Sequence, residues 1–198
     1  MNRPVVIKVG GSLLDWPDLP DRFRAFLAQY AGRKPLTVVG GGRAADAVRV
    51  LDWAHHVGDD VAHRLALRAL DLTAHLFAAI ISHTRVIDRI EDLAPCWEDN
   101  LLPILAPRRF LEEVDVLDLS PLPASWDVTS DSIAARLADY LHASELVMLK
   151  STPLPKGSDR HAAARLGVVD PHFCIEVGGL PRVTYLNLRD PLADPLSI

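Results

Sequence analysis

Short runs of apolar residues alternate along the chain with longer stretches in which apolar residues recur every three or four positions. The first run, Val5 to Val9, is interrupted only by Lys8, which is typical of a strand buried on both faces of a parallel sheet. By the same criterion, further strands are expected at residues 36–39, 84–87, 102–105, 114–117, 146–149 and 183–188.

The stretches between these runs have the spacing of helices with one apolar side. Helices are expected at about residues 18–30, 44–55, 60–82 and 130–141. In the second of them, Ala47, Val50, Leu51 and Ala54 share one side, which predicts a face turned toward a core. The repeated order of strand and helix predicts an α/β fold: a three-layer αβα sandwich with a mainly parallel central sheet, built as a single domain over residues 1–198.

Composition narrows the class of protein. The 198 residues are 49% hydrophobic and 24% charged, as in ordinary globular proteins, and the net charge of −5 argues against nucleic acid as a partner. No apolar run is long enough to span a membrane and no signal peptide is evident, so we expect no membrane partner and a cytoplasmic location. Cys96 and Cys174 form no disulfide framework, and no metal-ligand spacing is found, so no metal site is expected.

Lys8 and the residues after it form the first candidate site. A lysine at the end of a buried strand is costly unless an anion meets it. Gly10 and Gly11 would let the backbone approach a ligand and direct N–H groups toward it, with Ser12 beside them. Ligands of open α/β sheets bind at the carboxyl ends of the strands, so the pattern favours phosphate. An edge lysine followed by an ordinary glycine turn is the alternative.

A second glycine loop, Gly40-Gly41-Gly42-Arg43, separates a predicted strand from a predicted helix. Three glycines in a row are understandable if the main chain must contact a bound molecule at the helix N-terminus, where anions are favoured. Arg43 could add a planar fork for phosphate or carboxylate. A tight connection between strand and helix would use glycine as well, and stays open as an alternative.

Polar residues precede the last long helix. Thr129 or Ser130 suits its N-cap, and Asp131 in its first turn complements the helix dipole. Capping accounts for these short polar residues. It does not account for a second aspartate, Asp127, beside Trp126, so capping and a functional role can coexist.

Together, the Lys8–Ser12, Gly40–Gly42 and Thr129–Ala134 segments resemble the amino-acid kinase superfamily, which includes acetylglutamate, aspartate, carbamate and uridylate kinases. The resemblance implies the carbamate kinase-like fold, with ATP and Mg²⁺ as cofactors. It implies that Lys8 contacts the transferred phosphoryl group and that Asp131 orients the catalytic lysines. The second catalytic lysine, on the nucleotide side, is then Lys150, with Lys156 or an incomplete nucleotide site as the alternatives.

The remaining roles follow from the same resemblance. Phosphate and nucleotide binding is expected at Gly10, Gly11, Ser12, Lys150, Ser151 and Lys156, with the Gly10 and Gly11 amides on phosphate oxygens. Acceptor binding is expected at Gly40, Gly41, Gly42, Arg43, His63, Asp127 and Thr129.

The 125–134 segment, the Lys150-Ser151 pair and Ala62-His63 are similar to a small branch of kinases that phosphorylate a furanmethyl phosphate in methanofuran biosynthesis, a pathway of one-carbon metabolism. This similarity implies a phosphate monoester as the small-molecule acceptor, a diphosphate as the product and a homo-oligomer. An acylphosphate-forming kinase of a carboxylate or carbamate is the alternative enzyme. Residues 191–198 stand where the superfamily commonly has a glycine-rich segment, which leaves open a ligand-binding regulatory module without catalysis.

Overall fold

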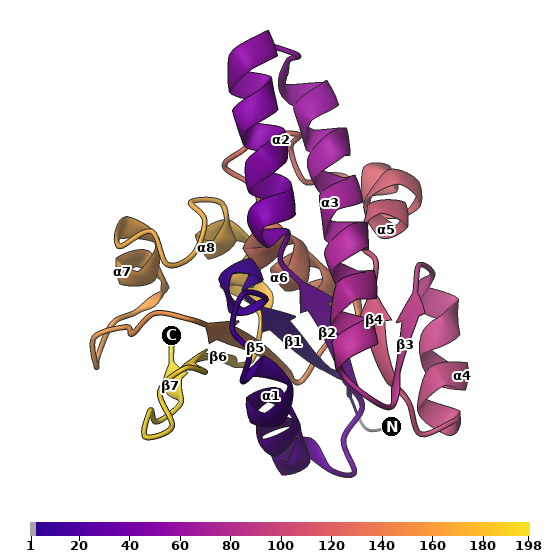
Figure 1. Cartoon of the computed structure of the whole chain (residues 1–198), viewed down its shortest axis with the longest axis vertical. Helices are drawn as coiled ribbons and strands as arrows, with labels where there is room; N and C mark the ends of the chain where they lie inside the picture. The colour runs from indigo at the N-terminus through magenta and orange to yellow at the C-terminus, as the bar shows by residue number, and fades with distance from the viewer. Residues whose placement is uncertain (1–2) are drawn as a thin grey trace.

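The computed structural model describes residues 3–198, and a single sheet of seven strands forms the middle layer of the described chain (Figure 1). The strand order is β3-β4-β2-β1-β5-β6-β7, and every neighbouring pair is parallel except β6 and β7. The strands are β1 (Val5–Val9), β2 (Pro35–Val39), β3 (Thr84–Ile87), β4 (Leu102–Leu105), β5 (Glu145–Lys150), β6 (Val183–Asn187) and β7 (Leu196–Ser197).

Helices cover both faces of this sheet. They are α1 (Leu19–Leu27), α2 (Gly42–His55), α3 (Asp59–Ile80), α4 (Leu93–Glu98), α5 (Arg108–Glu113), α6 (Ser130–Tyr140), α7 (Arg160–Arg165) and α8 (Phe173–Glu176). The side chains of Val5, Ile7 and Val9 pack in one core with α1 and the C-terminal half of α3. Val6 packs in the opposite core with α6. Because side chains alternate along a strand, Lys8 points to the α6 face as Val6 does.

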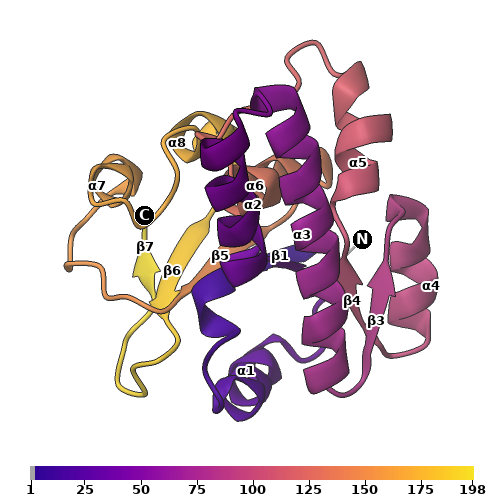
Figure 2. The same ribbon diagram turned by 45° about the horizontal axis from the view of Figure 1, so that its top comes forward.

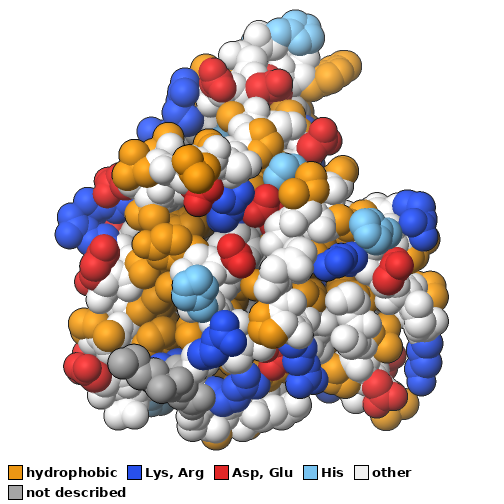
Figure 3. All heavy atoms as spheres, turned by 180° about the vertical axis from the view of Figure 1, so that it is seen from behind, with side chains coloured by type: hydrophobic (Ala, Val, Ile, Leu, Met, Phe, Trp, Pro, Cys, Tyr) orange, Lys and Arg blue, Asp and Glu red, His pale blue; other side chains and the backbone are white. Residues whose placement is uncertain are grey.

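Helices α2 and α3 pack against each other as a hairpin that projects beyond the sheet (Figures 1 and 2). Seen from behind, the hairpin is a lobe on which hydrophobic, charged and histidine side chains are interspersed (Figure 3). The apolar side predicted for α2 does not face a core, since Val50 is 63% and Leu51 57% exposed. That expectation was wrong because the hairpin extends past the sheet that would have covered it.

The predicted three-layer sandwich with a mainly parallel sheet is confirmed, and six of the seven predicted strands lie within one residue of the observed ones. The strand expected at residues 114–117 was wrong: α5 ends at Glu113, and Asp115–Leu117 form a helical turn. Asp115 is buried there, where it accepts a hydrogen bond from Leu122 N, while Val116 and Leu117 face solvent. Within residues 3–198, no helix is both long enough and apolar enough to cross a membrane.

Candidate active site

The carboxyl ends of β1 and β5 bring three charged side chains together. The two strands are parallel neighbours with Lys8 beside Met148, and Lys150 is the last residue of β5. Asp131 projects from the first turn of α6, where the Thr129 side chain caps the helix. Lys8 Nζ lies 2.5 Å from Asp131 Oδ1, and Lys150 Nζ donates to Asp131 Oδ1 and Oδ2 at 2.9 and 2.7 Å.

These three side chains form a buried cluster with one net positive charge. Lys8 is 3% and Asp131 4% exposed. Burial by itself raises the pKa of Asp131, but the ammonium groups of Lys150 and Lys8 lower it to about 2. Burial lowers the pKa of Lys150 to about 8, against the opposing effect of the Asp131 carboxylate. A buried cluster with excess positive charge and perturbed pKa values is typical of a site that receives an anion.

The two glycine loops pack directly against each other. A Cβ atom on Gly11 would lie 2.2 Å from Gly42 N, and one on Gly40 would lie 2.7 Å from Gly11 N, so larger residues cannot be placed there without moving the backbone. Gly42 also has a φ of +48°, which favours glycine. The Gly10 amide donates to Leu149 O at 2.8 Å. A phosphate contact from the Gly10 amide, as expected from the sequence, would require that bond to break.

The other residues expected on the nucleotide side lie at two separate places. Ser12 and Ser151 are joined by an Oγ–Oγ hydrogen bond of 2.7 Å, which links the loop after β1 to the residue after β5. Since Ser151 directly follows Lys150, this bond places Ser12 at the carboxyl end of β5. Lys156 is instead exposed and lies 3.8 Å from Asp194, so it takes no part in the buried ion pairs of Lys8 and Lys150 with Asp131. The nucleotide-binding role of Lys156 stays a prediction.

A cavity of about 270 Å³ adjoins the glycine loops between the α2–α3 hairpin and the start of α6. The Arg49 guanidinium lies over the Trp126 ring, 4.6 Å from its centroid, and Trp126 Nε1 donates to Asp52 Oδ2 at 2.9 Å. One wall therefore combines a cation with an aromatic ring. The lining residues are Gly11, Ser12, Gly40, Gly41, Gly42, Ala45, Asp46, Arg49, Ala66, Leu70, Trp126, Val128, Thr129 and Ser130.

Some of the residues expected to bind the acceptor line this cavity and others do not. Gly40, Gly41, Gly42 and Thr129 line the cavity. Arg43 does not, because its side chain is 83% exposed and its Nε lies 2.7 Å from Asp15 Oδ2.

Two further expected residues lie next to the cavity without lining it. Asp127 is exposed and follows the lining residue Trp126, and His63 stands one turn before Ala66 on α3. Burial lowers the pKa of the His63 imidazole. Acceptor binding by Arg43, Asp127 and His63 stays a prediction.

Sequence reasoning missed Arg49 and Asp46 on α2. A signal for them exists, because positions 42, 45, 46 and 49 share one side of a helix, and that side begins at the glycine loop. Trp126, which stands beside Asp127 in the sequence, also lines the cavity. Asp170, a buried carboxylate that contacts the start of α6, was missed altogether, and no local pattern marks it.

A parallel αβα sandwich with a lysine–aspartate–lysine cluster at its strand ends belongs to the class of α/β proteins that handle phosphate groups. Within that class, residues 3–154 match the model of the amino acid kinase family, and the chain belongs to this family. The resemblance recognised in the sequence is thereby confirmed.

Individual relatives agree with this assignment. The chain is 28% identical over 144 residues to the (5-(aminomethyl)furan-3-yl)methyl phosphate kinase of Methanocaldococcus jannaschii; the match covers 72% of this chain but only 63% of that protein. The UMP kinase of Ureaplasma parvum superposes with a TM-score of 0.64 at 17% identity over 98% of this chain and 93% of the other. The UMP kinase of Bacillus anthracis gives 0.64 at 12% identity, over 99% and 98%. Both UMP kinase structures show the fold.

Proposed function

We propose that this protein transfers the γ-phosphoryl group of MgATP to a phosphate monoester and so forms a diphosphate. The buried cluster of Lys8, Asp131 and Lys150 beside a cavity with a cationic wall is the observation that carries the proposal. Phosphoryl transfer depends on positioning and on neutralising the charge of the phosphate oxygens, more than on covalent chemistry by the protein. Membership of the amino acid kinase family supports the same reaction.

The chain's own residues can perform this reaction without a general base. Each lysine ammonium has three N–H donors, and Asp131 does not occupy all of them, so Lys8 and Lys150 retain donors for phosphate oxygens. A phosphate monoester is largely dianionic at pH 7, since its second pKa is about 6. An oxygen of that group can attack the γ-phosphorus while the bond to the bridging oxygen of ADP breaks, and no proton has to be removed.

The cavity supports a small acceptor that carries both a phosphate and an amine. The Arg49 guanidinium offers a planar fork for the phosphate. The Asp46 carboxylate lines the same cavity, 3.3 Å from the Arg49 guanidinium, and offers a negative charge for the amine. The Methanocaldococcus relative is named for an aminomethylfuran phosphate, which has both groups. We therefore infer a furanmethyl phosphate of methanofuran-type cofactor biosynthesis as the acceptor.

Mg²⁺ fits this proposal as a companion of the nucleotide. Within residues 3–198, no group of three or more His, Cys, Asp or Glu side chains could hold a metal ion, and both oxygens of Asp131 are engaged by lysines. Mg²⁺ commonly keeps several waters and binds through substrate phosphates with few protein ligands. When bound, it would neutralise charge on the nucleotide phosphates.

The experiment is a transfer assay with MgATP and a panel of acceptors, each tested separately. The acceptors are the aminomethylfuran phosphate, the same compound without its amine, UMP, several carboxylates, and carbamate. We expect ADP release and the phosphorus NMR signals of a diphosphate with the first acceptor, and weaker binding of the compound that lacks the amine. Arg49→Ala should raise the acceptor KM about tenfold or more and leave the KM for MgATP nearly unchanged. Arg24→Ala, on α1 in an exposed pair with Asp21, is the control.

Each other outcome contradicts the proposal in a recognisable way. An acylphosphate as the only product would identify a carboxylate or carbamate kinase. Nucleotide binding with no transfer to any acceptor would favour the regulatory module. Binding itself is measured by thermal shift, because a ligand at 100 times its Kd adds about 2.7 kcal/mol of stability.

We also infer a homo-oligomer that works in the cytoplasm. Exposed apolar side chains on the α2–α3 hairpin, among them Val50, Leu51, Trp53 and Leu72, support self-association. Use of ATP and the free thiols of Cys96 and Cys174 support the location. Light scattering on the purified protein measures the oligomeric state directly.

A further inference from the structure

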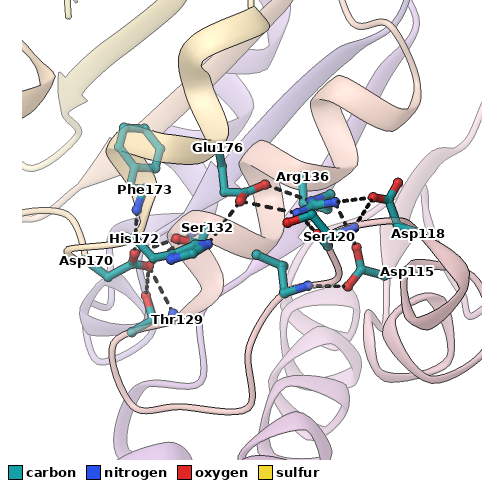
Figure 4. Close-up of polar contacts among 11 residues, drawn as sticks. Asp115, Asp118, Ser120, Thr129, Ser132, Arg136, Asp170, His172, Phe173 and Glu176 are labelled. Carbon is teal, nitrogen blue, oxygen red and sulfur yellow. Dashed lines mark hydrogen bonds and ion pairs between the residues drawn. The ribbon is translucent and has the colours of Figure 1, made fainter.

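Asp170 is a buried carboxylate outside the cavity, between the start of α6 and the start of α8 (Figure 4). It is 7% exposed and accepts five hydrogen bonds. Thr129 N and Oγ1 donate to it at 3.0 and 2.8 Å, Ser132 N and Oγ at 3.1 and 2.5 Å, and Phe173 N at 2.9 Å. All five donors are neutral groups.

These bonds make Asp170 an external cap for α6. The first backbone N–H groups of a helix have no partner within the helix, and Ser132 N in the first turn is satisfied by Asp170. The negative charge of Asp170 also lies at the positive end of the α6 dipole, which stabilises a buried carboxylate that has no cationic partner among these five contacts.

Thr129 connects this cap to the lysine cluster. Its hydroxyl donates to Asp170 Oδ2 and accepts the bond from Asp131 N at 3.3 Å. Asp131 is therefore held at two places, at its backbone through Thr129 and Asp170 and at its carboxylate by Lys8 and Lys150.

We propose that Asp170 is a positioning residue for phosphoryl transfer: it fixes the first turn of α6 so that Asp131 keeps both lysines aligned. The proposal rests on the function proposed above. Asp170 lies beyond residue 154, where the match to the family model ends, so its role is inferred from the contacts alone.

A second set of contacts, independent of Asp170, also holds α6 to α8. A positioning role of Asp170 can therefore be tested apart from a role in packing the two helices. Arg136 on α6 pairs with Glu176 on α8 at 2.7 Å and also faces Asp115 (Figure 4). The Phe173 ring is fully buried in the core that α6 shares. The two helices can therefore stay packed when Asp170 is replaced, while the first turn of α6 loses its external acceptor.

The test uses Asp170→Asn, which keeps the shape but directs an NH₂ group at backbone and hydroxyl donors. We expect kcat to fall about 10- to 100-fold, with the KM for either substrate changed little. Loss of a residue that supports a reacting group misplaces that group and typically lowers activity by this factor. In an Asp131→Asn background the same substitution should change kcat less than about twofold, since the residue it positions is already lost. Glu145→Gln is the control, because Glu145 is an equally buried carboxylate at the opposite end of β5, bonded to Thr184.

A second measurement does not depend on any acceptor. The chain has only four lysines, so protein labelled with ¹³C at lysine Cε gives four assignable signals. We expect Asp170→Asn to shift the signals of Lys8 and Lys150, and Glu145→Gln to leave them in place. If the wild-type protein transfers no phosphoryl group, the proposed function fails. The lysine signals then test by themselves whether Asp170 positions Lys8 and Lys150.

The proposal is overturned if Asp170→Asn leaves the Lys8 and Lys150 signals unchanged. It is also overturned if Asp170→Asn leaves the kcat of an active enzyme unchanged, or if it lowers kcat in the Asp131→Asn background as much as in the wild type. If Asp170→Asn does not fold, Thr129→Val and Thr129→Ser replace it. Both alter the side chain by little, but only serine retains the hydroxyl that joins Asp170 to Asp131 N. Equal kcat and equal lysine signals in these two variants would overturn the proposal as well.

Discussion

Replacing Asp131 by Asn removes one charge from the centre of the site and changes almost nothing in size. The carboxylate lies 2.5 to 2.9 Å from two ammonium nitrogens. At an effective dielectric constant of about 20, opposite unit charges about 3 Å apart attract by about 5 kcal/mol. The variant therefore leaves Lys8 and Lys150 as two buried like charges, and we expect the pKa of Lys150 to fall by at least about one unit, equivalent to about 1.4 kcal/mol.

The rate should fall with the alignment of the lysines. Loss of one preorganised donor to a developing oxyanion costs about 10² to 10³ in kcat, or about 2.7–4 kcal/mol, and we expect this range for both Lys8→Ala and Asp131→Asn. Since the two residues act as one unit, the double variant should lose far less than the product of the single losses.

Stability gives an independent signature of the pair. Removing one partner of a buried ion pair typically costs about 3–5 kcal/mol, because the remaining charge is left unmatched. Lys8→Ala introduced into Asp131→Asn removes one of the two repelling ammonium groups, so the double variant should melt at a higher temperature than Asp131→Asn alone. The assay is kcat at saturating MgATP and acceptor, with melting temperatures for all four proteins. Additive effects on kcat, or a stability loss with kcat unchanged, would refute the reasoning.

Two further predictions follow from the same site. Burial lowers the pKa of Lys150 to about 8, and the proposed reaction requires its charged form, so kcat/KM should fall about tenfold per unit as pH rises above 8; a flat profile up to pH 9.5 would contradict this. Gly11→Ala places a Cβ 2.2 Å from Gly42 N and should cost about 2 kcal/mol or more, a fall in Tm of at least about 4 °C. Gly178→Ala, with no atom within 4 Å of the added Cβ, is its control, and equal melting temperatures would disprove the steric argument.

The sheet could be predicted from the sequence because its central strands are buried on both faces. In β1 and β5 nearly every residue is buried, and this produces continuous apolar runs that do not depend on knowing the tertiary contacts. Residues 114–117, Val-Asp-Val-Leu, resemble such a run, but there the aspartate is buried and faces Arg136, while Val116 and Leu117 are exposed to solvent. Helices α4, α5, α7 and α8 are four to six residues long, too short for a helical period to show.

The site was predictable where it depends on strand ends and unpredictable where it depends on the direction of a helix. Lys8 and Lys150 each stand at the carboxyl end of a strand, so a parallel sheet alone brings them together. The contact of Arg49 with Trp126 joins residues far apart in sequence and exists only because the α2–α3 hairpin leans over the start of α6. Arg43 was expected in the site for its position after the glycines, but the first turn of α2 directs it outward to Asp15.

The glycine loops connect these two halves of the site. Their glycines first serve the close approach of one loop to the other, since Gly11, Gly40 and Gly42 have no room for a side chain. In the proposed reaction, this approach would also set the distance between donor and acceptor, because Gly11 belongs to the loop that follows Lys8 and Gly42 is the first residue of the helix that carries Arg49. A larger residue in either loop would move the cavity away from the lysine pair. The packing explanation and the functional explanation of these glycines, alternatives at the level of sequence, therefore become one explanation under the proposed reaction: tight packing of the loops holds the acceptor within reach of the phosphoryl group.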